Sequence, residues 1–476
     1  MSAELSIVAT LIVYKIVLLG VGAWASRRST DGSDFYLGGR RLGPWVASLS
    51  SAASSSSAWT LLGVSGAAYV KGLSAFWLMP ACVLGFAFNW FFVAGRLRRL
   101  GAQCGALTLT ELLAHDARGS MRRLLVVCAS VIVLLSLGVY VASQFQAAGK
   151  TFAEALDIGP VAAVSLGGAI VLIYTMSGGF WAVSVTDLLQ GLVMAAAAIV
   201  VPVAALVEVG GFAAMLEGLR AIDPALLDPM AGKIGFALVG FLAGTIGIGL
   251  GYPGQPHVVN RFMAMRNASD VRAGTVISLV WALIIYNGML IAGWCGRVLV
   301  HSMGDHEALF IRLSTDLFPP VVAGVIVAAV LSAIMSTADS QLLVCGASVA
   351  HDLPARGASK RVLVDRLAVV AIGIAALVAA LSVQETIFNS VLFAWSALGA
   401  AFGPWLLARL WIGPVSERWA LVSMLTGFVV TLVWYFTPEL KGAIYELVPA
   451  FAAATVPALL GAREGPKRST AGAATS

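Results

Sequence analysis

The sequence predicts an all-α protein that crosses a membrane many times. Of its 476 residues, 59% are hydrophobic and 11% are charged, whereas soluble domains average about 45–50% apolar and about 25% charged residues. The mean hydropathy is +0.91. Apolar runs such as residues 188–207 continue for the roughly 20 residues that a helix needs to cross the hydrocarbon core. Most of the chain is therefore expected to lie in lipid.

About thirteen transmembrane helices are expected along the chain. Residues 1–461 are predicted to form a single transmembrane domain, with residues 5–25 as an extra N-terminal helix and residues 418–461 as two C-terminal helices. Residues 462–476 form a short cytoplasmic tail. The predicted spans are 5–25, 44–70, 74–96, 123–149, 159–177, 181–208, 234–256, 274–300, 319–350, 362–382, 386–412, 418–437 and 442–461.

Loop charges predict the orientation. No basic residue precedes the first span, so we expect a retained helix with its N-terminus outside rather than a cleaved signal peptide. Basic residues then gather in every second loop, which is typical of cytoplasmic loops and explains the net charge of +6 without nucleic-acid binding. These bases are Arg27, Arg28, Arg40, Arg41, Arg96, Arg98, Arg99, Arg118, Arg122, Arg123, Arg261, Arg266, Arg272, Arg356, Lys360, Arg361, Arg463, Lys467 and Arg468. The opposite loops contain Asp223, Asp228, Asp305, Glu307 and Glu439.

Two predicted spans contain stretches that weaken a continuous helix. One is the serine-rich stretch from Ser48 to Trp59, and the other is the Gly/Pro-rich stretch from Gly247 to Pro256. Hydroxyls compete for backbone groups, glycine lacks stiffness and proline lacks a donor. In lipid, such breaks persist only where they line a cavity or lie within protein.

The two weakened spans open two blocks of five helices, residues 44–208 and residues 234–412. This correspondence predicts a five-plus-five inverted repeat in which the first helix of each half is broken and the binding site lies between the halves. The alternative is that small residues only allow close helix packing. The matching positions favour a binding site.

Intramembrane carboxylates and hydroxyls are the candidate functional groups. A carboxylate at the centre of a span costs about 2.5–3.5 kcal/mol even on insertion scales. We expect no Lys or Arg in the neighbouring spans to pair with Asp187 and Asp339, so that a cation or a proton is their partner. The alternative is that Asp187 lies nearer the membrane surface. Ser336 and Thr337 are adjacent hydroxyls of the kind that hard cations prefer, although such groups also bond to their own helix.

A series of short motifs runs in order through nearly the whole chain, and it resembles the sodium/solute symporter family, in particular its bacterial proline carriers. The motifs are Tyr36-Leu-Gly-Gly-Arg40 with Leu42-Gly-Pro44, Val93-Ala-Gly-Arg-Leu97, Ala106-Leu-Thr-Leu109, Ala182-Val-Ser-Val-Thr-Asp187, Gly249-Leu-Gly-Tyr252 with Gly254-Gln-Pro-His257, Met335-Ser-Thr337, Gln341-Leu-Leu-Val-Cys345 and Ala400-Ala-Phe-Gly-Pro404. The resemblance implies sodium-coupled symport of a small organic solute, proline or a similar amino acid, by alternating access in a bacterial inner membrane. It implies Na⁺ as coupling ion and no organic cofactor.

The resemblance also implies three groups of site residues. A sodium site would use the carbonyls of Ala53, Ser56 and Ala333 with the hydroxyls of Ser336 and Thr337. A second cation or proton site would use Asp187, Asp339 and Ser340, together with Ser336. The solute pocket would be lined at Ser57, Tyr140, Ile248, Tyr252 and Pro256.

Three positions depart from the proline carriers, which leaves alternatives open. Ser55 replaces an aspartate, Asp339 replaces a hydroxyl, and Ile248 replaces a tryptophan that faces the solute. Proton coupling, a monocarboxylate or another amino acid as solute, and a solute sensor without transport remain alternatives. No nucleophile, base and acid converge in the sequence, so an enzyme is not expected, and neither is an obligate protein or nucleic-acid partner.

Overall fold

Helices make up the fold, as the sequence predicts. The computed structural model describes residues 3–26, 36–175, 179–353, 361–382 and 385–464. Within these ranges the helices are joined by turns, and the one extended pairing is an isolated parallel bridge between Leu42 and Met265. The all-α class is therefore confirmed for the part of the chain that the structure describes.

Ten helical stretches of the described chain are long and apolar enough to cross a membrane. A helix or a broken helix lies at each of the thirteen predicted ranges. The number of thirteen crossings stays a prediction, because α9 (Pro160–Thr175) is shorter and α21 (Leu447–Glu464) is not among the ten. The ten are α1 (Ala3–Ser26), Trp59–Cys104, α8 (Gly119–Leu156), α10 (Phe180–Val209), Gly235–Gly254, α14 (Ala268–Leu299), Pro320–Asp352, α17 (Arg361–Ser382), α18 (Ile387–Trp411) and α19 (Glu417–Phe436).

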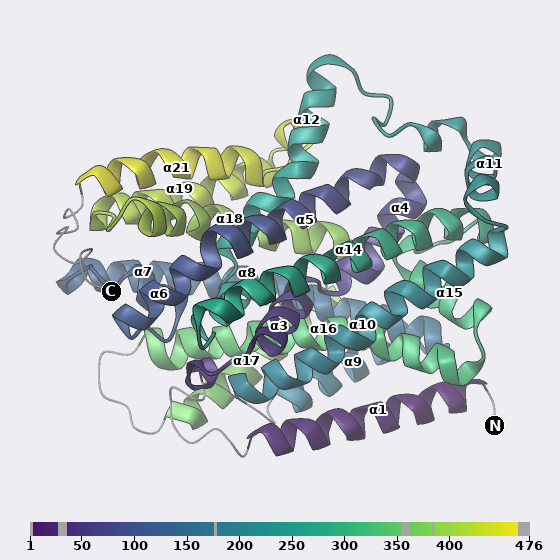
Figure 1. The fold of residues 1–476 in the computed structure, drawn as a ribbon, viewed down its shortest axis with the longest axis horizontal. Helices are drawn as coiled ribbons and strands as arrows, with labels where there is room; N and C mark the ends of the chain where they lie inside the picture. Colours follow the sequence, from purple (N-terminus) through teal and green to yellow (C-terminus); the bar gives the residue numbers. More distant parts are fainter. Residues whose placement is uncertain (1–2, 27–35, 176–178, 354–360, 383–384, 465–476) are drawn as a thin grey trace.

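The long helices lie roughly side by side in Figure 1, with α1 along the lower edge and α19 and α21 at the upper left. The start of α1 and the end of α21 lie at opposite ends of the molecule, which fits an odd number of crossings. Two helical stretches are central, namely α18 and Pro320–Asp352. In each of them 83% of an apolar 18-residue segment is buried inside the protein, against 28% in α1. The Pro320–Asp352 stretch contains α16 (Pro320–Ala347).

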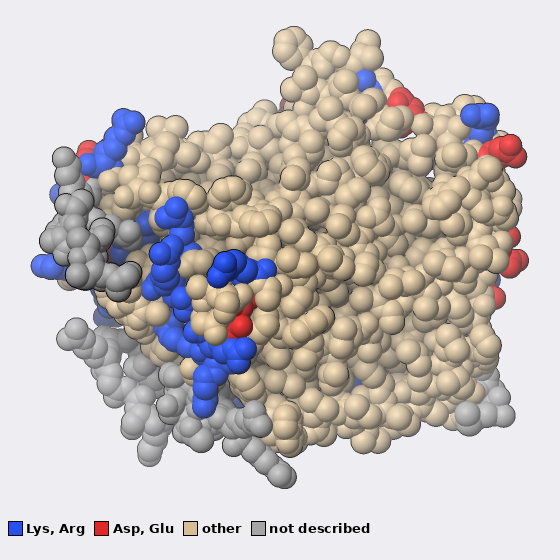
Figure 2. Space-filling view, in the orientation of Figure 1, with Lys and Arg blue, Asp and Glu red and all other residues tan. Residues whose placement is uncertain are grey.

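The surface separates charge from apolar side chains. Figure 2 shows Lys and Arg gathered at the left end of this face, near α6 (Gly95–Cys104) and α7 (Leu109–Leu113), and several Asp and Glu at the right end. The middle of the face is nearly free of charge. Large apolar side chains such as Phe91, Leu135 and Val203 are more than half exposed. An apolar band between charged ends is the surface that a bilayer requires.

The first weakened span is a broken helix, as predicted. Helix α3 (Pro44–Ser55) ends where Ser56 leaves helical geometry with φ −107° and ψ 66°. The chain resumes as a helix at Ala58 and continues through η2 (Trp59–Val64) and α4 (Ser65–Lys71). The Ala58 amide donates to the side-chain oxygen of Gln144 at 3.1 Å, which satisfies one backbone group freed by the break.

The second weakened span is also interrupted, but its predicted end is wrong. Helix α12 (Gly235–Ile246) passes into the 3₁₀ segment η6 (Gly247–Gly254), and the extended residue Gln255 follows. Beyond Pro256 the chain forms a further helix, α13 (Pro256–Met263), whose residues are all buried. This correction moves Arg261 from a predicted cytoplasmic loop into the interior of the protein.

Candidate functional site

The break after α3 faces the middle of α16, and this contact brings together most of the predicted sodium ligands. The Ser336 hydroxyl lies 3.2 Å from the Ala53 carbonyl oxygen and 3.3 Å from that of Ala333. The Thr337 hydroxyl lies 3.4 Å from the Ala53 oxygen and 3.1 Å from the carbonyl oxygen of Ser54. All five residues are buried.

The remaining predicted ligand, Ser56, lies at the break itself. Its amide donates to the Ala52 carbonyl oxygen at 3.0 Å, and its hydroxyl has no hydrogen-bond partner among the described residues. The Ser54 carbonyl, which the sequence did not indicate, joins the group through Thr337. A cluster of hydroxyl and carbonyl oxygens at the end of a broken helix has the chemistry of a site for a hard cation.

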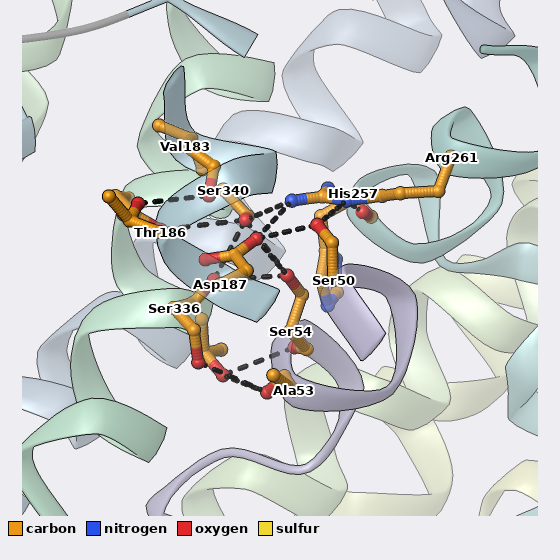
Figure 3. Close-up of polar contacts among 12 residues, drawn as sticks. Ser50, Ala53, Ser54, Val183, Thr186, Asp187, His257, Arg261, Ser336 and Ser340 are labelled. Atoms are coloured by element: carbon orange, nitrogen blue, oxygen red, sulfur yellow. Dashed lines mark hydrogen bonds and ion pairs between the residues drawn. The ribbon is translucent and has the colours of Figure 1, made fainter. Parts of the chain in front are cut away.

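A second polar cluster surrounds Asp187 on α10 (Figure 3). One of its carboxylate oxygens accepts hydrogen bonds from Ser50 at 2.6 Å and Ser54 at 3.3 Å. Ser54 also lies 3.0 Å from the Ser340 hydroxyl of α16 and donates to the Ser336 carbonyl at 3.1 Å. Ser54 therefore links the two clusters.

The expectation that the intramembrane acids lack a basic neighbour is wrong. Arg261 is 1% exposed, and its guanidinium lies 3.1 Å from the Asp187 carboxylate. The same guanidinium donates to Ser50 at 3.0 Å and to Ser340 at 2.5 Å. Asp187 is fully buried within the protein.

A second base was overlooked in the first predicted span. Lys15 on α1 donates to the Met335 sulfur and interacts electrostatically with Asp339. Of the Asp339 carboxylate oxygens, one lies 3.5 Å from the Ser340 hydroxyl, and the other has no hydrogen-bond partner among the described residues. Asp187 and Asp339 thus belong to one group of two buried acids, the buried Arg261 and the half-buried Lys15.

The predicted solute pocket corresponds to a tight cavity beside the first helix break, with a volume of about 10 Å³, which is room for about one water molecule. Tyr140, Ile248 and Tyr252 line it, as predicted. Ser57 accepts a hydrogen bond from the Tyr140 hydroxyl at 3.2 Å, so it supports the wall, whereas Pro256 begins α13 and does not line the cavity.

Several lining residues were missed, most of them on helices remote in the sequence from the first break. Trp395 on α18 packs edge-on against Tyr252 with a centroid distance of 4.8 Å, and its indole donates to the Ile248 carbonyl at 3.0 Å. A Cβ at Gly251 would lie 2.0 Å from the Trp395 indole nitrogen, so only glycine fits there. The other missed lining residues are Ser55, Trp59, Cys82, Tyr286, Val391 and Leu392.

Hollows adjoin the buried site from both ends of the helices. A wide vestibule of about 1560 Å³, which includes open solvent, shares Ile248 and Leu392 with the central cavity and is bordered by Lys71 and Lys441. At the opposite, basic end, a small pocket with a volume of about 20 Å³ reaches Arg261. The other residues lining this inner pocket are Tyr36, Leu107, Thr108, Phe180, Asn260, Ser340, Leu343, Val344 and Ala347.

Helix α7 flanks the inner pocket. Thr108 donates to Asp352 at 2.8 Å, and Glu111 lies 3.1 Å from the ring of His351. Burial opposes ionisation of Glu111, but hydrogen bonds from His351 and the Leu107 amide, with nearby positive charge, lower its pKa below the ordinary value. This cluster joins α7 to the end of the α16 stretch.

Comparison with known proteins decides the family. The sequence model of the sodium:solute symporter family matches residues 35–427. The chain belongs to this family. The symporter is 36% identical to the osmoregulated proline transporter OpuE of Bacillus subtilis, over 94% of this chain and 92% of that protein. It is 35% identical to the high-affinity proline transporter PutP of Bacillus subtilis, over 92% and 93% of the two chains. It is 33% identical to the sodium/proline symporter of Escherichia coli, over 94% and 91%.

Solved structures support the fold of this symporter. A Na⁺-coupled sialic acid symporter, in a substrate-bound outward-open state, superposes with a TM-score of 0.78 over 97% of this chain and 98% of that chain, at 19% identity. MhsT in complex with L-phenylalanine gives a TM-score of 0.54 over 88% and 97% of the two chains, at 15% identity. The fold is thus that of membrane transporters, and the expectation that the chain is not an enzyme agrees with its family.

Proposed function

We propose that this symporter carries proline together with sodium across a bacterial inner membrane by alternating access. The observation that carries the proposal is the likeness to the three proline transporters described above, which are 33–36% identical over nearly the full length of both chains. The site chemistry supports it independently, because one oxygen cluster suits a hard cation and the adjoining cavity has the aromatic and hydroxyl lining of a site for a small solute.

The sodium ion would bind where α3 breaks against α16. Ala53, Ala333, Ser336 and Thr337 contribute oxygens to one buried cluster, and Ser56 lies at its edge. A cation there would join the two helices and replace the hydrogen bonds that now connect them. This would couple ion occupancy to the position of α3, which also carries Ser55 at the solute cavity.

The solute would occupy the aromatic cavity. Tyr252, Trp395 and Trp59 would supply flat apolar walls for a compact ring, and the Tyr140 hydroxyl, which Ser57 holds, would bind a carboxylate. In the proline carriers a tryptophan that faces the solute stands at the position of Ile248, and here Trp395 would have that role. The two residues line the same cavity and are hydrogen-bonded.

The wider architecture is part of the proposal. Residues 44–208 and 234–412 would form the two inverted repeats, each opening with one of the broken helices, and thirteen crossings would place the N-terminus outside and the C-terminus in the cytoplasm. The two interrupted helices, the charge separation in Figure 2 and the opposite positions of the ends of α1 and α21 support this arrangement.

Proton coupling is the second candidate, and one observation favours it. Asp339 has a buried carboxylate oxygen without a hydrogen-bond partner among the described residues, as a proton carrier would. Proteoliposomes with the purified chain separate the candidates. We expect radiolabelled proline uptake when a sodium gradient is imposed at equal pH, and little uptake from a proton gradient without sodium. Uptake that follows pH and ignores sodium would reject sodium coupling.

The same proteoliposomes test the solute. Unlabelled proline should compete with labelled proline much more strongly than other amino acids, monocarboxylates or sialic acid do. A monocarboxylate that competes better than proline would replace the proposed solute while leaving the coupling result intact.

A further inference from the structure

We propose that the guanidinium of Arg261 is a tethered cation, a positive charge fixed to the chain, that takes the place of a sodium ion in the second cation site. This symporter would then bind one sodium ion instead of two. The inference rests on the proposed sodium coupling and extends it to the number of ions. It assigns a role to the one residue of the buried network that the sequence placed in a loop.

The position of the guanidinium is the first argument. The second cation site implied by the family resemblance uses Asp187, Asp339 and Ser340. One guanidinium nitrogen of Arg261 lies 3.1 Å from the Asp187 carboxylate and 2.5 Å from the Ser340 hydroxyl, as Figure 3 shows. A sodium ion coordinated by the same two oxygens would need the space of that nitrogen, and its charge would repel the guanidinium.

The charge balance of the cluster is the second argument. In formal charge, the two acids Asp187 and Asp339 are matched by the two bases Arg261 and Lys15, and Arg261 pairs directly with Asp187. A buried charge is tolerated when it is paired and hydrogen-bonded. This group is balanced without another ion, and a further sodium ion would leave an excess positive charge in a buried place.

The way Arg261 is held is the third argument. Its guanidinium donates to Ser50, to the His257 carbonyl oxygen and to Ser340, and it lies over the Phe180 ring at 5.1 Å. These contacts come from four helices, so the guanidinium is fixed at the crossing of α3, α10, α13 and α16. An arginine fixed in this way acts as a resident ligand of Asp187, rather than as a mobile surface charge.

Removal of the charge should therefore create a sodium site. In Arg261→Met, Asp187 loses its partner, while Ser50, Ser54 and Ser340 remain as neutral oxygen ligands beside two carboxylates. The carboxylates then repel each other unless a cation enters. We expect a second sodium ion to bind between them.

The experiment counts bound ²²Na⁺ at equilibrium on the purified full-length chain without solute. We expect one sodium ion per chain in the wild type and in Arg261→Lys, and two in Arg261→Met. The double variant Arg261→Met with Asp187→Asn should return to one. Arg266→Met is the matched control, because Arg266 is an exposed arginine near by that pairs with Asp270 outside the site. The ratio of sodium to proline fluxes in proteoliposomes should rise from one to two in Arg261→Met.

Each outcome bears on a separate claim. Two ions in the wild type, or one in an Arg261→Met chain that still binds proline, would overturn the tethered cation and leave sodium coupling standing. A wild-type chain that binds no sodium would reject the proposed coupling itself. If Arg261→Met does not fold, the wild type and Arg261→Lys decide, since two ions in either one contradict the inference and one ion in both supports it.

Discussion

The guanidinium of Arg261 on α13 lies 3.1 Å from the carboxylate of Asp187 on α10. This ion pair joins a helix of the first block, residues 44–208, to one of the second block, residues 234–412. Breaking a buried ion pair by removal of one partner costs about 3–5 kcal/mol, because the other charge stays buried and unpaired. We expect Arg261→Met to lower the unfolding temperature in detergent by several degrees without sodium.

Sodium should reverse much of that loss. A ligand that binds only the folded chain stabilises it, by about 2.7 kcal/mol when its concentration is 100 times its dissociation constant. Thermal unfolding at rising sodium concentration, with potassium holding the ionic strength constant, checks this. The unfolding temperature should rise more steeply in Arg261→Met than in Arg266→Met, and parallel curves would count against a new site.

The sodium site at α16 gives a second prediction. Replacement of both Ser336 and Thr337 by Ala removes two oxygens from the cluster at the α3 break. Apparent sodium affinity in proline uptake should fall at least tenfold, which corresponds to about 1.4 kcal/mol. The control is Ser314→Ala on α15 (Leu309–Leu317), a buried serine that bonds within its own helix. Unchanged sodium dependence in the double variant would remove these residues from the site.

The aromatic cavity gives a third prediction. Trp395→Phe removes the indole that donates to the Ile248 carbonyl, and Tyr140→Phe removes the hydroxyl that bonds to Ser57. Each loss is worth about 1 kcal/mol or more, so proline affinity should fall about fivefold or more. Tyr69→Phe, which removes a hydrogen bond to the Val300 carbonyl away from the cavity, is the control. Equal affinities in all three variants would show that the cavity is not the solute site.

Orientation can be measured directly. Ser120 at the start of α8 and Ser302 after α14 are both exposed and are predicted to face opposite compartments. In intact cells, Ser302→Cys should react with an impermeant thiol reagent and Ser120→Cys should not, with the wild-type chain as the control for its native cysteines. Reaction of Ser120→Cys alone would invert the predicted topology.

The cluster at α7 predicts a pH dependence. The pKa of Glu111 is lowered in the folded chain, so its ionised form stabilises the fold above the unfolded pKa of about 4.3, and this contribution disappears as pH falls through the lower folded value. Loss of the hydrogen bonds of Glu111 should lower the free energy of unfolding by about 1 kcal/mol and the unfolding temperature by about 2–4 °C. Glu111→Gln should unfold earlier than wild type at pH 7, and the difference should shrink below about pH 4. A difference that stays constant with pH would rule out this charge effect.

Local sequence patterns were sufficient to predict where the two helices break, but not to predict which residues lie beside the breaks. The serine run before Trp59 and the Gly/Pro run before Pro256 both mark real interruptions. Arg261 was misplaced because a proline followed by a histidine, an asparagine and an arginine resembles the end of a span. The apolar residues Val258, Val259, Phe262 and Met263 were the signal that α13 continues inside the protein.

The solute cavity could be predicted only in part. Tyr140, Ile248 and Tyr252 came from family motifs, whereas Trp395 lies on α18, far along the chain, within an apolar helix that offers no local sign of a binding residue. Its role arises from tertiary packing against the glycine at 251. Lys15 was missed for a similar reason, since only the packing of α1 against α16 brings it to Asp339.

The two ends of the central cavity imply unequal kinetics for the transport cycle. Towards the vestibule, Ile248 and Leu392 belong to both hollows, so aliphatic side chains separate the two on that side. Towards the inner pocket stands the Arg261 network, whose opening must separate hydrogen-bonded charges on different helices. We expect solute to exchange quickly with the vestibule, and release on the other side to set the turnover rate.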